Sequence, residues 1–375
     1  MAITLFATIE NSYLKLAWSD SVTRLYPYCV LLASIERHSE RIRDVLSDIT
    51  QRHINTEDNK TLEYAPYLDR LERAGGELFA ALFDAKDNAE VAQEAEDMLR
   101  HSGDRQELSI FSEICVPWGF VHDRAFKTQK TSSGTIEDFS GFWSSRFILT
   151  LRGGQQPSRM APGPRKRETF RMLHALHKDR FNKALERLPR RQKEILEGIV
   201  DYAVGNVTNW DECRDKWSGI QENDSILHIF GHSDGTKIYL KDSSADETYC
   251  LEADRFKSLF AKGKQTRSVT ICFLNGCRTG GGQVGGSFLD VLFDTGFQGF
   301  IGTEAEVSNE FAAFYVAEFM NLLWNEGLSV RDAFDALRTK LFPLSLMYSC
   351  YAHPEFCVET ARGATTDVTP PQKCA

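Results

Sequence analysis

The sequence predicts an α/β protein with a mainly parallel sheet and helices on both faces of that sheet. From residue 224 onward, short apolar segments alternate with segments whose apolar residues recur at helical spacing, which is typical of this class. Two of the short segments, SILHIF and VTICFLN, read as buried strands that stop abruptly in small and polar residues. With 375 residues, the chain can form one large α/β domain or two packed lobes.

The first part of the chain, residues 1–151, is expected to form an α+β lobe. Two apolar segments, ITLFATI and LKLAW, predict strands, and a helix is expected from about Cys29 to Arg52. Residues 77–100 have helical spacing in their first half and a polar second half. Ser109–Phe120 and Phe142–Leu151 read as two further strands.

Residues 152–167 are expected to form a flexible loop or linker. This segment holds three glycines and three prolines and lacks apolar periodicity. A long helical stretch is predicted to follow, from about Glu168 to Val204, because apolar residues recur on one face. Pro189 is expected to break it into two helices.

The remaining elements, up to residue 361, follow in an alternating order. The pattern predicts strand Ile226–Phe230, strand Lys237–Leu240, helix Ala253–Ala261, strand Val269–Leu274, helix Ser287–Asp294, strand Gly299–Gly302, a helix capped by Ser308, a helix capped by Ser329 and strand Tyr348–Val358. The Thr/Pro-rich tail, residues 362–375, is predicted to be disordered.

Two of the predicted strands lead into chemically reactive residues, the first into His232 and the second into Cys277. In an open parallel sheet, functional residues gather at the carboxyl ends of strands. A thiolate nucleophile needs an imidazole within hydrogen-bond reach to take or share its proton. Arg278 and the N-terminus of the helix expected after it would both favour the thiolate form. We therefore predict that Cys277 is a nucleophile and that His232 is its general acid/base.

Each candidate also has a structural interpretation. A cysteine commonly serves as a small buried apolar residue, and Cys272, inside its strand, is expected to do so, whereas Cys277 lies beyond its strand among glycines. His228 lies on the strand and is expected to be packed, in a structural or orienting role. A zinc site of His228, His232 and Cys277 is not favoured, because H-x-x-x-H presents both rings together on a helix and this segment reads as a strand.

Two further segments allow more than one interpretation. Gly280–Gly286 could cradle a phosphate, but it lacks the Lys-Ser/Thr of a P-loop and the spacing of a dinucleotide fingerprint, so we favour a mobile substrate-binding loop. Arg165–Lys193 holds eleven Lys/Arg residues against three acids. A solvated helix face explains it best, a docking surface for an acidic partner comes second, and nucleic acid comes third.

Composition indicates an enzyme of the reducing cytoplasm and argues against several other classes. Charged residues make up 26% and hydrophobic residues 42% of the chain, and the net charge of −9 argues against nucleic acid as a direct ligand. No apolar run approaches the roughly 20 residues of a membrane span. The N-terminus lacks the basic region of a secretion signal. The nine cysteines include no C-x-x-C, so neither a zinc ribbon nor a disulfide framework is indicated.

The sequence HIFGH with a downstream LNGC resembles the CHAT family of caspase-like cysteine peptidases. In that family an apolar strand leads into H-x-x-G-H, which His228, Gly231 and His232 match, and a second strand leads into a Leu–small–small–Cys turn, which Leu274–Cys277 matches. The similarity extends over roughly residues 105–360 and includes the Gly-Thr exit of Phe300–Thr303, the S-V-x-x-A helix at Ser329–Leu337 and the Pro-Trp segment Ile114–Phe120.

The resemblance implies a caspase-like three-layer α/β/α fold for residues 168–361. Residues 1–151 would be a less regular lobe, in one interpretation a degenerate copy of the same fold. The backbone N–H groups of Cys277 and Ser233 would form the oxyanion hole. Many family members have glycine where this chain has Ser233, and a strained backbone there would cost more with serine.

The resemblance further implies a cysteine endopeptidase that cleaves a protein substrate through a thioester, without metal or cofactor. Candidates for the substrate pocket are Asp234, Glu304 and Gly276, and the two acids would favour a basic residue on the acyl side of the cut. Because no sensor module is visible, a separate protein activator or regulator is expected, in a bacterial defence or stress response. Two other classes remain open: a catalytically silent interaction scaffold, and a cysteine hydrolase or transferase that acts on small molecules.

Overall fold

The structure is a computed structural model. It describes residues 2–54, 64–124, 141–153, 164–200, 203–220, 222–234, 236–242, 246–260, 268–277, 299–352 and 354–359, together with residues 288, 291, 295 and 297. The linker residues 154–163, most of the predicted helix Ser287–Asp294, the glycine-rich segment after Cys277 and the tail from residue 362 lie outside the described residues.

The N-terminal lobe, residues 2–153, is built around a five-stranded sheet with the strand order β3-β2-β1-β4-β5. Strands β1 and β2 form an antiparallel hairpin, whereas β1, β4 and β5 run parallel. The bounds of the strands are Ile3–Glu10 for β1, Tyr13–Ser19 for β2, Tyr28–Leu31 for β3, Glu107–Ser112 for β4 and Ile148–Gly153 for β5. Its helices are α1 (Leu32–Ile54), α2 (Ala65–Phe83), α3 (Ala89–His101) and α4 (Trp143–Arg146), with a 3-10 turn at Trp118–Phe120.

The C-terminal lobe, residues 164–359, contains a six-stranded sheet with the order β15-β14-β13-β9-β7-β8. Five of its strands are parallel and β15 is antiparallel to β14. Their bounds are Arg171–Leu176 for β7, Ala203–Val207 for β8, Ser225–Phe230 for β9, Thr270–Asn275 for β13, Gly299–Thr303 for β14 and Tyr348–Cys350 for β15. The predicted mixed α/β fold with a mainly parallel sheet and an N-terminal α+β lobe is confirmed.

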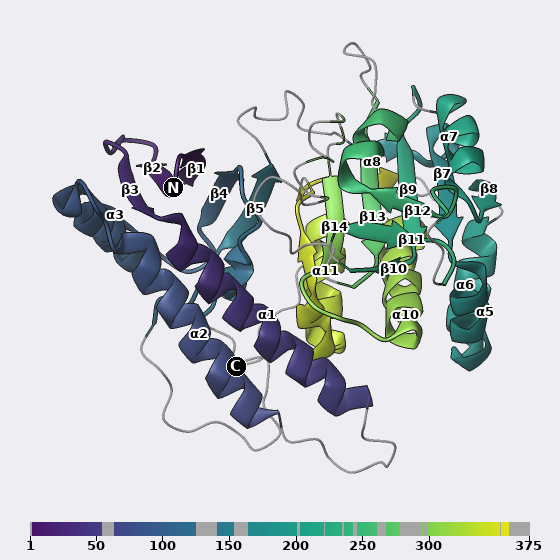
Figure 1. Ribbon diagram of the computed structural model, residues 1–375, viewed down its shortest axis with the longest axis horizontal. Helices are drawn as coiled ribbons and strands as arrows, with labels where there is room; N and C mark the ends of the chain where they lie inside the picture. The colour runs from purple at the N-terminus through teal and green to yellow at the C-terminus, as the bar shows by residue number, and fades with distance from the viewer. Residues whose placement is uncertain are drawn as a thin grey trace, which may run out of the picture.

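Helices cover both faces of this sheet. Alternation along β13 shows the two sides: Cys272 lies near Cys213 of α7 (Trp210–Ser218), and the ring of Phe273 lies 5.4 Å from that of Phe319 of α10 (Asn309–Met320). Figure 1 shows the two lobes side by side, with the N-terminal lobe in purple and blue and the C-terminal lobe in teal to yellow. The helices of the C-terminal lobe are α5 (Lys178–Arg187), α6 (Arg190–Val200), α7 (Trp210–Ser218), α8 (Ala253–Phe260), α10 (Asn309–Met320) and α11 (Val330–Lys340).

The prediction of a helical stretch from Glu168 to Val204 is wrong at both ends. Arg171–Leu176 is strand β7, which lies between β8 and β9, and Ala203–Val207 is strand β8. The middle forms α5 and α6, which are separated near Pro189 as expected. Five consecutive residues of β7 are buried because neighbouring strands and both helical layers cover it. Such a run satisfies helical spacing as well as strand burial, so periodicity could not distinguish the two.

Several smaller predictions also differ from the structure. The helix expected from Cys29 begins at Leu32, because Tyr28–Leu31 pairs with β2 as an edge strand. The last predicted strand is divided into β15 and the short β16 (Val358–Glu359). Strand β16 pairs with β6 (Arg165–Lys166), so the end of the predicted linker is paired backbone.

A small antiparallel sheet extends from the C-terminal end of β9. It consists of β10 (His232–Ser233), β11 (Lys237–Tyr239) and β12 (Cys250–Glu252). No helix in the described part of the chain is long and apolar enough to cross a membrane.

Candidate active site

The structure brings the ends of the two predicted strands to the same edge of the sheet. Strands β9 and β13 are parallel neighbours, and Asn275 is the register partner of Phe230. The Gly231 N–H donates to the Asn275 carbonyl at 3.0 Å, which continues the pairing past both strands. His232 and Cys277 therefore each lie two residues beyond one register pair, on strands that neighbour each other. Adjacent strands lie about 4.8 Å apart, so the two strand ends that lead into these residues are neighbours.

A third strand ends at this edge and carries a histidine that the sequence analysis did not single out. Leu176 of β7 is also a register partner of Phe230, and the His177 N–H donates to the Phe230 carbonyl at 2.7 Å. The His177 side chain is buried, and its Nε2 lies 3.1 Å from Asp242 Oδ1. Because β7 was predicted as helix, nothing in the sequence pattern placed His177 beside His232.

His232 is half-buried, and its ring is held by the β10–β11 pair. His232 and Tyr239 are register partners, and their rings stack with centroids 5.9 Å apart. Burial lowers the pKa of His232 below its ordinary value, and the nearby positive charge of Arg180 lowers it further. The carboxylates of Asp234 and Asp242 oppose this shift. A lowered pKa leaves the imidazole neutral at pH 7, which is the form that can accept a proton.

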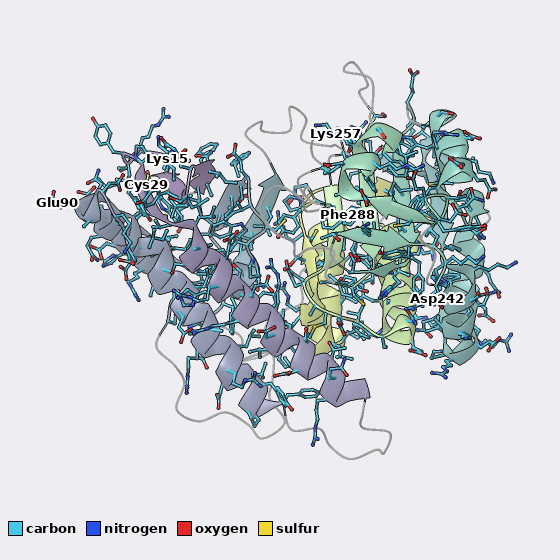
Figure 2. The ribbon with its side chains drawn as sticks, in the orientation of Figure 1. Lys15, Cys29, Glu90, Asp242, Lys257 and Phe288 are labelled. Carbon is cyan, nitrogen blue, oxygen red and sulfur yellow. The ribbon has the colours of Figure 1, made fainter. Side chains whose placement is uncertain are left out.

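Asp242 links this region to helix α5. Its Oδ1 accepts a hydrogen bond from Arg180 Nε at 2.8 Å, which adds to its contact with His177. Figure 2 labels Asp242 on the side of the C-terminal lobe where α5 runs. The acid thereby reduces the field of the Arg180 charge near His232.

Cys277 follows directly on a turn residue whose carbonyl is held by the next strand. The Thr303 hydroxyl at the end of β14 donates a hydrogen bond to the Gly276 carbonyl. Cys277 itself is half-buried. In contrast, Cys272 is fully buried as predicted, and burial raises its pKa well above the ordinary value, so it stays a thiol. The expected influence of Arg278 on Cys277 falls outside the described residues.

A buried polar network surrounds Asn275, two residues before Cys277. The Tyr348 hydroxyl donates to Asn275 Oδ1 at 2.7 Å, and Asn275 Nδ2 donates to the Ala312 carbonyl at 3.2 Å. Asn275 Nδ2 also lies 3.4 Å from His228 Nε2, and His228 Nδ1 lies 3.0 Å from His174 Nδ1. Strands β7, β9, β13 and β15 and helix α10 are thus tied together at one level of the sheet.

Both histidines of this network are uncharged. Burial lowers the pKa of His174 to about 4 and that of His228 well below its ordinary value. An amide N–H can only donate, so we assign His228 Nε2 as the acceptor and His228 Nδ1–H as the donor to His174. His174 Nε2 then carries the remaining proton, and it is buried with no hydrogen-bond partner in the described structure. The predicted burial of His228 is confirmed.

The structure gives Ser233 a relaxed backbone. Ser233 is buried, and the register pairs it with Ile238 across the β10–β11 ladder. The described non-glycine residues with positive φ are Asn11 and Arg105, so Ser233 is not one of them. Serine at this position therefore carries no positive-φ strain.

The two acidic pocket candidates have different surroundings. Asp234 is exposed and caps its own turn, because its Oδ1 accepts hydrogen bonds from the N–H groups of Thr236 and Lys237 at 2.9 and 2.8 Å. Glu304 is fully buried, and its Oε2 lies 3.2 Å from Arg43 Nε of helix α1. The Glu304 side chain is therefore enclosed and paired with Arg43, and its place in the substrate pocket stays a prediction. Sequence spacing placed it near the site, but only the packing of α1 against the C-terminal lobe determines its partner.

The structure also contains a cleft of about 690 Å³ between the two lobes. It is lined by Phe120 and Leu149 of the N-terminal lobe and by Phe334, Arg338 and Tyr348 of the C-terminal lobe, among others. Neither His232 nor Cys277 lines it, so the cleft does not coincide with the candidate dyad. Within the described residues, no group of three His, Cys, Asp or Glu side chains could hold a metal ion.

Comparisons with known proteins support the fold. No family model matches the sequence, and no curated protein matches it. Among solved structures, a chain of the Saccharomyces cerevisiae separase–securin complex at 2.6 Å resolution matches with a TM-score of 0.52 and 11% identity, over 96% of this chain and 30% of that chain. The 3.0 Å structure of the same complex matches with a TM-score of 0.49 and 10% identity, over 95% of this chain and 30% of that chain. A structure described as a protease matches with a TM-score of 0.40 and 9% identity, over 87% of this chain and 76% of that chain.

At these identities the likeness concerns the fold alone. This chain shares a fold with a chain of the separase–securin complex, and it spans 30% of the length of that chain. What the chain does must therefore be argued from its own residues.

Proposed function

We propose that this chain is a caspase-like cysteine endopeptidase of the CHAT type, with Cys277 as nucleophile and His232 as general acid/base. The observation that carries the proposal is the β9–β13 register, which leaves both residues two positions beyond one pair of adjacent strand ends. The lowered pKa of His232 adds to it, because a neutral imidazole can take the thiol proton. The fold shared with a chain of the separase–securin complex is consistent with this chemistry.

The reaction follows the usual course for a thiol nucleophile. His232 accepts the Sγ proton while Sγ attacks the scissile carbonyl carbon, and the carbonyl oxygen takes up the displaced electron pair. The backbone N–H groups of Cys277 and Ser233 would stabilise that oxyanion. Collapse of the intermediate breaks the C–N bond, and His232 returns the proton to the leaving amine. A water molecule, deprotonated by His232, then attacks the thioester carbon. The C–S bond breaks, the acid is released, and the proton on His232 returns to Cys277 Sγ.

The partners in this proposal are a protein substrate and a separate protein that regulates cleavage. The segment after Cys277, rich in glycine, is the element on which a regulator would act, since it adjoins the nucleophile and offers few side chains for packing. A reducing cytoplasm suits the reaction because it keeps the thiol available. A role in bacterial defence or stress response rests on the family resemblance alone.

A thiol-reactive peptide probe, applied together with a positional peptide library, tests the proposal. We expect the probe to form its adduct at Cys277, and we expect His232→Ala to lower the adduct rate and to abolish peptide cleavage. Cys272→Ala is the matched control, since that thiol is buried inside β13. This variant should keep full activity.

The same experiment separates the other classes. Adduct formation at Cys277 without cleavage of any peptide or protein would favour a hydrolase or transferase of small molecules. A wild-type chain that neither reacts with the probe nor cleaves substrate, with or without candidate regulators, would favour an interaction scaffold.

A further inference from the structure

A buried ion pair connects the two lobes close to the candidate nucleophile. Arg43 belongs to α1 of the N-terminal lobe, and Glu304 directly follows β14 of the C-terminal lobe. Arg43 Nε lies 3.2 Å from Glu304 Oε2, and the side chains are 3% and 0% exposed. Figure 1 shows α1 extending from the N-terminal lobe across to the C-terminal lobe.

The guanidinium of Arg43 is held on several sides. Its Nη1 lies 2.7 Å from Glu40 Oε1, and its Nη2 donates to the Cys115 carbonyl at 2.9 Å. The Glu304 backbone N–H donates to the Met347 carbonyl at 2.8 Å. Four polar contacts thus converge at the end of β14 from four parts of the chain. A rigid cation in such surroundings defines the position of the carboxylate that it binds.

Thermodynamic stability alone explains this pair poorly. A buried ion pair is often no more stabilising than apolar residues of the same volume, because desolvation offsets the Coulombic gain. Removal of one partner is costly, since it leaves an uncompensated buried charge. What the pair supplies dependably is geometry, at a point where the two lobes meet.

Glu304 is connected to the proposed nucleophile, Cys277, through two peptide-bonded pairs of residues and one hydrogen bond. Glu304 is bonded to Thr303, the Thr303 hydroxyl donates to the Gly276 carbonyl, and Gly276 is bonded to Cys277. The path from the Arg43 guanidinium to the Cys277 backbone therefore contains no gap. The opposite side of the turn is held by Asn275, through Tyr348 and Ala312.

We propose that Arg43 is a positioning residue for Cys277, acting from the N-terminal lobe through Glu304, Thr303 and Gly276. The proposal rests on the assignment of Cys277 as the nucleophile. A displacement of about 1 Å at a reacting atom can cost about 100-fold in rate. The N-terminal lobe is then part of the catalytic apparatus, because it supplies the cation that sets the nucleophile turn.

A second link between the same two elements provides a matched control. Gln51, two turns further along α1, donates from Nε2 to Glu306 Oε2 at 3.4 Å, and this contact is exposed. It joins α1 to the segment after β14 without bonding to Thr303 or Gly276. A variant of Glu306 therefore weakens the lobe contact and leaves the path to Cys277 intact.

The experiment measures the alkylation of Cys277 by iodoacetamide as a function of pH, with mass spectrometry to resolve each cysteine of the full-length chain. The variants are Thr303→Val, Arg43→Met, Arg43→Lys and the double variant Arg43→Met/Glu304→Met, with Glu306→Ala as the control. The double variant removes both charges at similar volume, so it should fold even where Arg43→Met does not. Buried Cys272 reports unfolding within the same molecules.

We expect Thr303→Val, Arg43→Met and the double variant to slow Cys277 alkylation at pH 7 about tenfold and to change its pH profile, because the position of the thiol relative to His232 is altered. With peptide substrate, kcat should fall by a similar factor while KM changes little. Arg43→Lys should recover part of the rate, and Glu306→Ala should match the wild type. Alkylation of Cys272 should stay slow in all of them.

Two outcomes are decisive and separable. A folded double variant with the wild-type alkylation profile and the wild-type kcat would overturn the positioning role of Arg43. An unchanged peptidase activity in Cys277→Ala would instead overturn the proposed function. The two outcomes can be told apart because the alkylation assay needs no substrate and is measured independently of cleavage.

Discussion

The two lobes each end parallel strands at one edge of a sheet, but the proposed nucleophile and the proposed imidazole base both follow strands of the C-terminal lobe. In the C-terminal lobe, β7, β9 and β13 lead into His177, His232 and Cys277. In the N-terminal lobe, Ala7 of β1 and Gly153 of β5 are the register partners of Ser112 of β4. The next residue, Glu113, accepts the Ile9 N–H at 2.8 Å and so completes the backbone hydrogen bonding.

The lobes also differ in how they satisfy buried polar groups. In the N-terminal lobe, Arg146 pairs with Asp123 and donates to the carbonyls of Leu99 and Ser102 at 2.6 and 2.8 Å. The network of Asn275, His228 and His174 is instead made of neutral groups, whereas the buried Arg43–Glu304 pair reaches the Cys277 turn only through Thr303. Neutral hydrogen bonds hold these strands together without adding a charge next to Asn275. In both lobes the sheet positions the residues that follow its strands, and the types of those residues determine the chemistry.

We expect the largest loss of activity from replacing the cysteine that follows β13, and almost none from replacing the cysteine that follows β4. Cys277→Ala should lower kcat/KM by at least about 1,000-fold, because it removes the covalent route. Cys115→Ala should leave activity within about twofold, since the Cys115 backbone carbonyl that binds Arg43 is kept. Steady-state kinetics on one peptide substrate provide the measurement. Comparable losses in both variants would mean that the two strand ends are not distinguished by chemistry.

The next effect concerns the charged cluster of the N-terminal lobe. Arg146→Met should reduce the free energy of unfolding by about 3–5 kcal/mol, because Asp123 would be left buried without its cation. The folded fraction should keep its kcat. Arg124→Met removes an exposed partner of Asp104 and should cost less than about 1 kcal/mol. Denaturant titrations of both variants test this, and equal losses would show that burial of the pair is not the deciding factor.

Because His174 and His228 are buried in their neutral forms, we expect the free energy of unfolding to fall in acid. In the folded chain, burial holds the pKa of His174 at about 4 and that of His228 well below its ordinary value, whereas both titrate near pH 6.5 when unfolded. Below pH 6.5 the unfolded chain binds more protons, so the free energy of unfolding should fall by up to about 1.4 kcal/mol per pH unit for each histidine. The stability that depends on neutral histidines is complete above pH 6.5 and is lost as the pH falls toward about 4.

Denaturant titrations between pH 7.5 and pH 5 measure that slope. In the double variant His174→Leu/His228→Leu, the free energy of unfolding should change less steeply with pH than in the wild type. The difference should correspond to up to about two protons taken up on unfolding. His101→Gln, at an exposed position on α3, should keep the wild-type slope. An unchanged slope in the double variant would mean that the two histidines are not the acid-sensitive groups.

The smallest expected effect is a shift of the acid limb of kcat/KM, which follows the pKa of His232. Arg180→Gln should move this limb to higher pH, because it removes a cation that lowers the pKa and releases Asp242. Asp242→Asn should move it to lower pH. Each shift should be below about one pH unit, since both side chains are partly screened by solvent. Shifts of the opposite sign would show that another group controls the limb.

The sequence alone determined the alternation of strands and helices after residue 224 and the placement of His232 and Cys277 at strand ends. These predictions succeeded where the pattern is local: a buried strand stops at glycine or a polar residue, and the next helix begins at Ser308 or Ser329, whose side chains cap it. The burial of Cys272 and His228 also followed from strand position.

Tertiary structure decided the features that depend on neighbours far away in the chain. Arg171–Leu176 is a strand because β8 and β9 flank it, although its spacing also suits a helix. His174 and His177 joined the site only through that strand. Glu304 became the partner of Arg43, 261 residues earlier, because α1 packs across the end of β14. Local pattern reveals which surface of a segment is apolar, but only the packing of the whole chain determines which polar group must find a partner where water is excluded.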